Sequence, residues 1–149
     1  GDEPFLPYAR DPKTLARKWA IPGTKGLEHR IGGLEKQNET GNVDYDPHNH
    51  EFMSRLRAEK VQRIQADIDD IEVYGDTDGI GVISWGSTFG AIRTGVDDAR
   101  KAGIKVGHVH LRWLNPLPAN LEEVINGFSQ CAVAEMNLGQ LHRRAWLRL

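Results

Sequence analysis

The stretch that decides the fold reads IGVISWGST and covers residues 80–88. Its first six residues form a nearly continuous apolar run, which is typical of a strand covered on both faces. Gly86, Ser87 and Thr88 then turn the chain. Apolar residues follow at helical spacing, at Phe89, Ile92, Val96 and Ala99, and Gly103 stands where a helix C-cap is expected. The stretch therefore predicts a strand joined by a tight turn to a helix.

The same alternation continues towards the C-terminus. Val106 to Leu111 predicts a second strand, and residues 112–118 a loop, because two prolines there cannot continue either element. Asn120 with Glu123 is typical of a capping box before a short helix at Leu121 to Asn126, which Gly127 ends. Residues 131–134 predict a third strand. Strands that alternate with helices predict parallel βαβ units, so we expect an α/β fold with a mostly parallel sheet.

The first half of the chain has a different character. One amphipathic helix is clear, with Asn49 as its cap and an apolar stripe at Phe52, Met53, Leu56, Val61, Ile64, Ile68 and Ile71. It should end before a turn or linker at residues 75–79, and the residues before Asp46 should form an irregular arm. We therefore expect a connecting arm plus helix over residues 1–75 and an α/β domain over 76–149.

The composition limits the classes of function that the chain can have. The 149 residues suffice for one domain with an arm, and the net charge of −2 gives no reason to expect nucleic acid as a partner. No apolar run approaches the length of a membrane span. The single cysteine, Cys131, allows no internal disulfide, suits a cytoplasmic location and cannot by itself ligate an iron–sulfur cluster. Without an initiator Met or a signal pattern, the chain is expected to be a fragment.

Two short motifs are candidates for binding. Gly86, Ser87 and Thr88 lie between a strand and a helix, where backbone N–H groups could hold an anion. The simpler interpretation is an ordinary helix start with small residues. Glu28, His29 and Arg30 could form an acid/base or orienting group. The alternative is a charged surface turn, because adjacent residues on an extended chain point apart.

Three further groups have the side chains that metal sites or active sites use. One group, Asp44, Asp46, His48 and His50, has ligand types that suit zinc or another transition metal. Turn and helix-cap roles for Asp46-Pro47 and Asn49 are simpler, and we expect no metal. His108 and His110 share one face of a strand and are either catalytic or hydrogen-bonded core histidines. Glu135 would share the carboxyl edge of the sheet with Ser87 and Asn115. The alternative is that it caps the next helix or bonds a neighbouring loop. None completes a nucleophile–base–orienter set, so no catalytic residue is expected here.

Four stretches together resemble a known family. They are PGTKGLEHRIGGLEKQNETGNVDYDPHNH (22–50), VISWGST (82–88), HLRWLNPLP (110–118) and AEMNLGQL (134–141). In order and spacing they resemble the alpha subunit of 2-oxoacid:ferredoxin oxidoreductases, closest to the 2-oxoglutarate type, over residues 1 to about 141. The resemblance implies that residues 80–141 form a three-layer α/β/α domain like the C-terminal domain of transketolase. The end, LHRRAWLRL, departs from the expected longer helix and further strand.

The resemblance also implies a function. The whole enzyme would oxidatively decarboxylate a 2-oxoacid with coenzyme A and pass electrons to ferredoxin, using thiamine diphosphate, magnesium and an iron–sulfur cluster. A beta subunit would supply most cofactor contacts, so this chain alone would bind none and be inactive. Residues 22–50 would connect domains and approach a partner subunit or the shared active site. The residues expected to do so are Glu28, His29, Arg30, Asp46, His48 and Asn49.

Other functions remain open from the sequence. The chain could be a non-catalytic interaction or anion-binding module that uses Ser87 and Thr88, or the C-terminal domain of another thiamine diphosphate enzyme. A homodimer of the fragment is also possible. The residues that select among 2-oxoacids are expected to lie outside this chain, so the sequence does not indicate which one is used.

Overall fold

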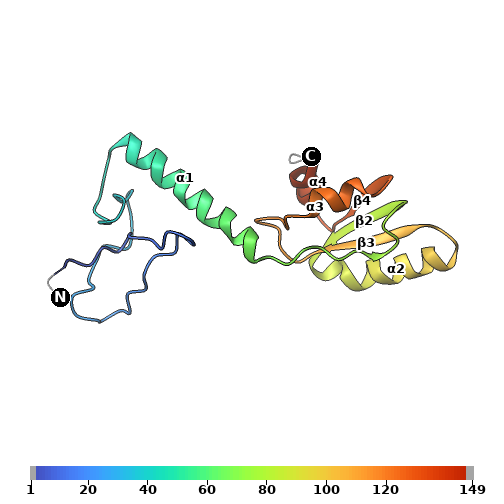
Figure 1. Cartoon of the computed structure of the whole chain (residues 1–149), viewed down its shortest axis with the longest axis horizontal. Helices are drawn as coiled ribbons and strands as arrows, with labels where there is room; N and C mark the ends of the chain where they lie inside the picture. The colour runs from blue at the N-terminus through green and yellow to red at the C-terminus, as the bar shows by residue number, and fades with distance from the viewer. Residues whose placement is uncertain (1–2, 147–149) are drawn as a thin grey trace. The chain divides into compact units, whose positions relative to one another are not determined.

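The computed structural model describes residues 3–146 and divides into two compact units, Gly1–Ile64 and Gln65–Leu149. We call them the N-terminal unit and the C-terminal unit (Figure 1). Residues 65–75 fall in the C-terminal unit. The domain division after residue 75 stays a prediction.

The N-terminal unit contains an irregular arm and one long helix. Among the described residues before Asp46 there are turns and three isolated antiparallel bridges: Tyr8↔Glu39, Arg10↔Arg17 and Lys36↔Val43. Helix α1 then covers Pro47–Arg63. The predicted arm is therefore present, and its loops are closed by backbone pairing rather than by regular strands.

The start of α1 differs from the prediction. Its N-cap is Asp46, whose Oδ1 accepts a hydrogen bond from the His48 amide at 2.9 Å, and Pro47 occupies the first turn. Proline suits that position because it lacks the N–H that the first turn leaves unpaired, and a carboxylate there complements the helix dipole. Asn49 as the cap is wrong: it lies inside the helix and bonds to the arm.

The predicted apolar stripe is also not the face of one helix. α1 ends at Arg63, a short 3₁₀ helix covers Ile64–Asp67, and the chain is irregular from there to β1. Within α1 the stripe is mostly exposed, and only Met53 is buried, at 1% exposure. Ile71 instead packs against the core of the C-terminal unit. The predicted stripe thus combined residues of the N-terminal unit with Ile68 and Ile71, which belong to the C-terminal unit.

The C-terminal unit is built on a four-stranded sheet of order β1-β3-β2-β4. β2 (Ile80–Trp85) is central and pairs in parallel with β3 (Val106–Leu111) and with β4 (Gln130–Ala134). These strands confirm the predicted mostly parallel sheet. The sequence did not indicate β1 (Tyr74–Gly75), which pairs antiparallel with β3, because two residues carry no period of their own.

Helices cover both faces of this sheet, as Figure 1 shows. α2 (Phe89–Lys101) lies on one face, while α3 (Leu121–Asn126) and α4 (Gln140–Trp146) lie on the other. The main core lies on the α3/α4 face and contains Ile83, Val109, Leu111, Leu117, Leu121, Ile125, Phe128 and Leu141. The predicted three-layer α/β/α arrangement is confirmed. The likeness to transketolase stays a prediction.

Two details of this unit differ from the sequence-based expectations or lie beyond them. α3 has the predicted bounds, but the Asn120 side chain does not cap it. Its Oδ1 accepts from the Ile71 amide at 2.9 Å and its Nδ2 donates to the Ile71 carbonyl at 3.1 Å, so it ties the segment before β1 to the core. Of the departing end LHRRAWLRL, the last three residues lie outside the described part of the chain.

Candidate functional site

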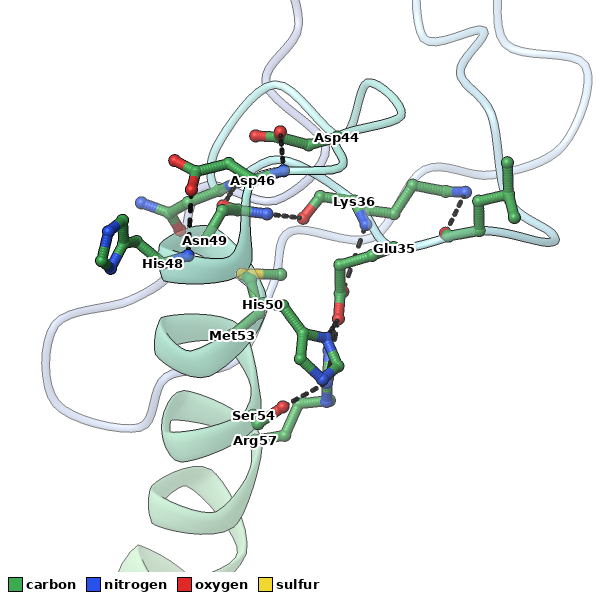
Figure 2. A network of polar contacts seen from close by, with 12 residues as sticks. Glu35, Lys36, Asp44, Asp46, His48, Asn49, His50, Met53, Ser54 and Arg57 are labelled. Carbon is green, nitrogen blue, oxygen red and sulfur yellow. Dashed lines mark hydrogen bonds and ion pairs between the residues drawn. The ribbon is translucent and has the colours of Figure 1, made fainter.

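Glu35 is the centre of a polar network between the arm and the first turns of α1 (Figure 2). Its Oε2 lies 2.6 Å from His50 Nδ1, and Arg57 donates to both carboxylate oxygens, at 3.1 and 3.4 Å. The Glu35 side chain is only 20% exposed. Arg57, with a further hydrogen bond from His50, lowers the pKa of Glu35 to about 2. The carboxylate is therefore ionised throughout the physiological range and fastens the loop at residue 35 to the helix.

Asn49 and Lys36 extend this network. Asn49 Nδ2 donates to the Lys36 carbonyl at 3.0 Å, and Asn49 Oδ1 accepts from the Asn38 amide at 3.1 Å. The Lys36 side chain is buried at 4% exposure, and its Nζ donates to the carbonyls of Gly32 and Leu34. A buried ammonium group requires such partners, because an unpaired buried charge is strongly unfavourable. These contacts fix the fold of residues 32–38 on the start of α1.

The predicted group Glu28, His29 and Arg30 does not form an acid/base pair. Glu28 Oε2 accepts from the Gly26 amide at 2.8 Å, while His29 Nδ1 lies 2.8 Å from the Leu27 carbonyl. The His29 ring also packs edge-on against Phe5, with centroids 5.5 Å apart. Arg30 is exposed. Glu28 and His29 thus make local contacts and Arg30 is exposed, which agrees with the alternative of a charged surface turn.

The carboxylates and imidazoles of residues 44–50 are engaged in local structure. Asp44 accepts from the Asp46 amide at 2.9 Å, Asp46 caps α1, and His50 contacts Glu35. His48 uses only its backbone in this turn, and its side chain is exposed. Over residues 3–146, no group of three or more His, Cys, Asp or Glu side chains is arranged to hold a metal ion.

A second polar cluster lies inside the C-terminal unit, between the sheet and α2. Ser84 Oγ is 2.6 Å from His108 Nε2 and 2.9 Å from His110 Nδ1. β2 and β3 set this geometry, because their parallel register pairs Ser84 with His110. Phe89 of α2 covers both rings, at centroid distances of 5.6 and 4.9 Å. Ser84 is 0% exposed and His108 is 2% exposed.

This cluster is a core hydrogen-bond network rather than a reaction centre. Burial, with smaller contributions from His110 and Arg93, lowers the pKa of His108 to about 4, so the ring is neutral at pH 7. Burial likewise lowers the pKa of His110. A fully buried hydroxyl offers no substrate access to its oxygen. Of the two alternatives for His108 and His110, the geometry favours hydrogen-bonded core histidines.

The carboxyl edge of the sheet carries the other predicted candidates. Glu135 follows β4, and its carboxylate accepts from the amides of Leu141 and His142 at 3.0 and 3.1 Å. Although partial burial opposes the shift, the amides of His142 and Leu141 lower the pKa of Glu135. The Glu135 carboxylate thus caps the N-terminus of α4, which confirms the helix-capping alternative.

Gly86, Ser87 and Thr88 form a short 3₁₀ helix before α2. Gly86 has a φ of +61°, a left-handed conformation that favours glycine. The Thr88 hydroxyl donates to the Trp85 carbonyl at 2.7 Å, so it is directed into the turn. An anion site at these three residues stays a prediction.

No sequence motif marks the residues that hold the arm together. Glu35, Lys36 and Arg57 do not stand out, because charged residues of this kind occur throughout the first half of the chain. Glu35 is 15 positions from His50 and 22 from Arg57, so no local spacing links them. A charged residue beside a turn-rich segment carries no signal of burial until the fold brings its partner near.

Replacing Glu35 with glutamine should loosen the arm. We expect Glu35→Gln to lower the local free energy of unfolding there by about 1 kcal/mol, a value discounted for the half-exposed Arg57 and the exposed His50. Exchange of the Gln37, Gly41 and Asp44 amides, which bond across this loop, should accelerate about fivefold. The folded pKa is depressed, so this stability is present above the unfolded pKa and is lost as the pH falls towards 2.

Glu51→Gln is the matched control for this substitution. Glu51 also belongs to the start of α1, but among the described residues its carboxylate pairs only with Arg55 four residues on, and both side chains are well exposed. We expect its effect on exchange of the same amides to be within twofold, because such helix pairs contribute about 0.3–0.5 kcal/mol. Equal exchange rates in the two variants would contradict a special role for Glu35.

Comparison with known proteins covers both units. The family model for pyruvate:ferredoxin oxidoreductase core domain II matches residues 79–145, which include β2 to most of α4. The 2-oxoglutarate oxidoreductase subunit KorA of Mycobacterium tuberculosis is 52% identical over 142 residues, which are 93% of this chain and 21% of that protein. The alpha subunit of 2-oxoacid:ferredoxin oxidoreductase 1 of Aeropyrum pernix is 28% identical over 92% of this chain and 22% of its own length.

A solved structure has the same fold over nearly the whole chain. It is the 2-oxoglutarate:ferredoxin oxidoreductase from Magnetococcus marinus with 2-oxoglutarate, coenzyme A and succinyl-CoA bound. The TM-score is 0.83 at 30% identity, over 99% of this chain and 26% of that one. This chain therefore spans about a fifth to a quarter of the length of these relatives. The chain belongs to the family of 2-oxoacid:ferredoxin oxidoreductase alpha subunits.

Proposed function

We propose that this chain is part of the alpha subunit of a 2-oxoglutarate:ferredoxin oxidoreductase. Such an enzyme oxidatively decarboxylates 2-oxoglutarate with coenzyme A, releases carbon dioxide and passes the electrons to ferredoxin. The observation that carries the proposal is the 52% identity to a 2-oxoglutarate oxidoreductase subunit over 93% of this chain. That likeness includes the arm as well as the α/β unit, so it does not rest on a common fold alone.

Within the enzyme we assign this chain a role in assembly rather than chemistry. Many of its large apolar side chains are exposed, among them Met136 at 89%, Leu138 at 86% and Tyr45 at 81%. Exposed apolar groups of this size are typical of surfaces that other parts of an assembly cover. Over the described residues, the side chains of Arg30 and His48 have no hydrogen bond or ion pair and are exposed, so of the six predicted contact residues these two are the most available.

The cofactors of the proposed reaction would be held elsewhere in the enzyme. With one cysteine, this chain does not fit an iron–sulfur cluster, which requires several thiolates. Its described His, Cys, Asp and Glu side chains form no group of three or more arranged to hold a metal ion. We propose that a beta subunit contributes the thiamine diphosphate, magnesium and cluster contacts, and that ferredoxin is the electron acceptor. We also propose a cytoplasmic location for the enzyme. In the described part of the chain, no helix is long and apolar enough to cross a membrane.

The test is reconstitution of the whole enzyme. The full alpha subunit that contains this chain is co-expressed with its beta subunit, and reduction of a redox dye is followed. We expect reduction that depends on both 2-oxoglutarate and coenzyme A. Omission of either substrate is the control. Absence of activity across a panel of 2-oxoacids would overturn the proposal, and activity with another 2-oxoacid alone would overturn the assignment of 2-oxoglutarate.

A further inference from the structure

The N-terminal unit contains two adjoining cavities, of about 460 and 330 Å³. They are neighbours, because Tyr8, Arg17, Ile31 and Lys60 line both. We call the two together the cationic groove. All its lining residues lie between Pro7 and Lys60, so it belongs to one unit. Volumes of 300–1,000 Å³ are usual for sites that bind small molecules.

The groove is strongly basic in a chain whose net charge is −2. Its lining includes the cations Arg10, Arg17, Lys18, Lys36, Arg57 and Lys60 and a single carboxylate, Glu35. Arg57 and His50 already engage that carboxylate. Over the described residues, neither Arg17 nor Lys60 has a carboxylate within ion-pair distance. The groove therefore has positive charge that the described residues do not neutralise.

Arg10 also lies within this excess of positive charge. Its guanidinium bonds to Asn38 Oδ1 and the Tyr8 carbonyl, which are neutral acceptors. Burial, and then the nearby charges of Arg17 and Arg57, lower the pKa of Arg10. A bound anion would relieve this repulsion, and a guanidinium group suits phosphate because its planar donors can bond two oxygens at once.

Aromatic rings lie beside these charges. The Arg17 guanidinium is 4.4 Å from the centroid of the Tyr8 ring, which fixes it at the junction of the two cavities. Trp19 lines the smaller cavity, and its side chain is 93% exposed. An exposed indole next to a positively charged track is the combination that binds the base and phosphate of nucleotides, because every base offers a flat π face.

We propose that the cationic groove binds a phosphorylated nucleotide, with its phosphates on Arg17 and Lys60 and its base against Trp19. The size of the groove, its unneutralised cations and its exposed indole fit this class of ligand together. Two sources of the ligand share the chemistry: coenzyme A, which carries a phosphorylated adenosine, and a free adenine nucleotide such as ADP. This inference does not depend on the proposed enzyme activity.

The test is direct binding to the whole chain by calorimetry, with coenzyme A, ADP and uncharged adenosine as probes. We expect coenzyme A or ADP to bind, adenosine to bind at least about tenfold more weakly, and affinity to fall with added salt. The double variant Arg17→Gln/Lys60→Gln should weaken nucleotide binding about tenfold or more. Trp19→Ala should weaken it by a smaller factor. A circular dichroism spectrum like that of the wild type is required of each variant.

Lys13→Gln/Lys25→Gln is the matched control. It removes the same charge from the same unit at two exposed lysines outside the groove, and nucleotide affinity should not change. Absence of nucleotide binding by the wild type, or equal weakening in the groove and control variants, would overturn the inference. Binding of an acidic peptide in place of nucleotides would overturn it as well.

The assembled enzyme separates the two sources. If coenzyme A is the ligand, Arg17→Gln/Lys60→Gln should raise the KM for coenzyme A about tenfold at nearly constant kcat. If a free nucleotide is the ligand, ADP should bind more tightly than coenzyme A and that KM should not change. Nucleotide binding by the chain would stand even if no 2-oxoacid were oxidised, so failure of the proposed function and failure of this inference are distinguishable.

Discussion

Gly107→Ala is expected to unfold the C-terminal unit or to destabilise it by more than about 3 kcal/mol. A Cβ at this position in β3 would overlap the Asp76 carbonyl oxygen, and would lie 3.0 Å from atoms of Phe128 and Val73. The carbonyl belongs to backbone that directly follows β1, whose Gly75 pairs with Gly107. It cannot retreat without breaking that pairing. Thermal unfolding of the whole chain, followed by circular dichroism, measures the loss.

Gly95→Ala is the matched control for the same added methyl group. Gly95 lies in α2, and a Cβ there would meet no atom within 4 Å. Alanine is a better helix former than glycine, so this variant should be stabilised by about 0.5–1 kcal/mol. If Gly107→Ala melted within two degrees of the wild type, the close approach of β3 to the segment after β1 would be refuted.

Phe128→Ala should destabilise the C-terminal unit by about 3–5 kcal/mol. The ring belongs to the main core, is 8% exposed, and lies over two glycines on neighbouring strands. A Cβ on Gly81 would come within 2.6 Å of this ring, and one on Gly107 within 3.0 Å. The ring therefore fills space that both strands leave empty. Its removal creates a cavity that the backbone cannot close, and chemical denaturation would detect the loss.

Phe52→Ala is the control for this truncation. Phe52 lies on α1 and is 48% exposed, so it buries much less apolar surface. Its loss should cost less than about 1 kcal/mol. A cost for Phe128→Ala no greater than that for Phe52→Ala would contradict the packing of the ring across β2 and β3.

The parallel core could be predicted from the sequence because its signal is local. Apolar runs at residues 80–85 and 106–111 match β2 and β3 at both ends, since turn residues bound each run. The short β1 could not be found, because its pairing depends on β3 and not on its own two residues. Asn120 has the pattern of a helix cap, but a tertiary partner, the backbone of Ile71, binds its side chain instead.

The candidate sites were less predictable than the fold. That residues 22–50 approach a partner subunit or the active site stays a prediction. The ion pair between Glu35 and Arg57, which fixes this segment to α1, forms only in the folded unit. The cationic groove likewise joins Arg17 and Lys60, which are far apart in the sequence. Charge in a sequence does not reveal which cations lack a counter-ion, because that depends on where the carboxylates lie in the folded chain.

The buried Ser84 hydroxyl lies within hydrogen-bonding distance of two histidine rings, those of His108 and His110. A hydroxyl group carries one hydrogen, so only one of its contacts with His108 and His110 can use it. The other ring must supply its own N–H. When both rings are neutral, one therefore presents a lone pair to Ser84 and the other a proton. One imidazole therefore accepts a hydrogen bond from Ser84, and the other donates one to it. Exchanging these two roles requires the Ser84 hydroxyl to rotate and both rings to change tautomer together.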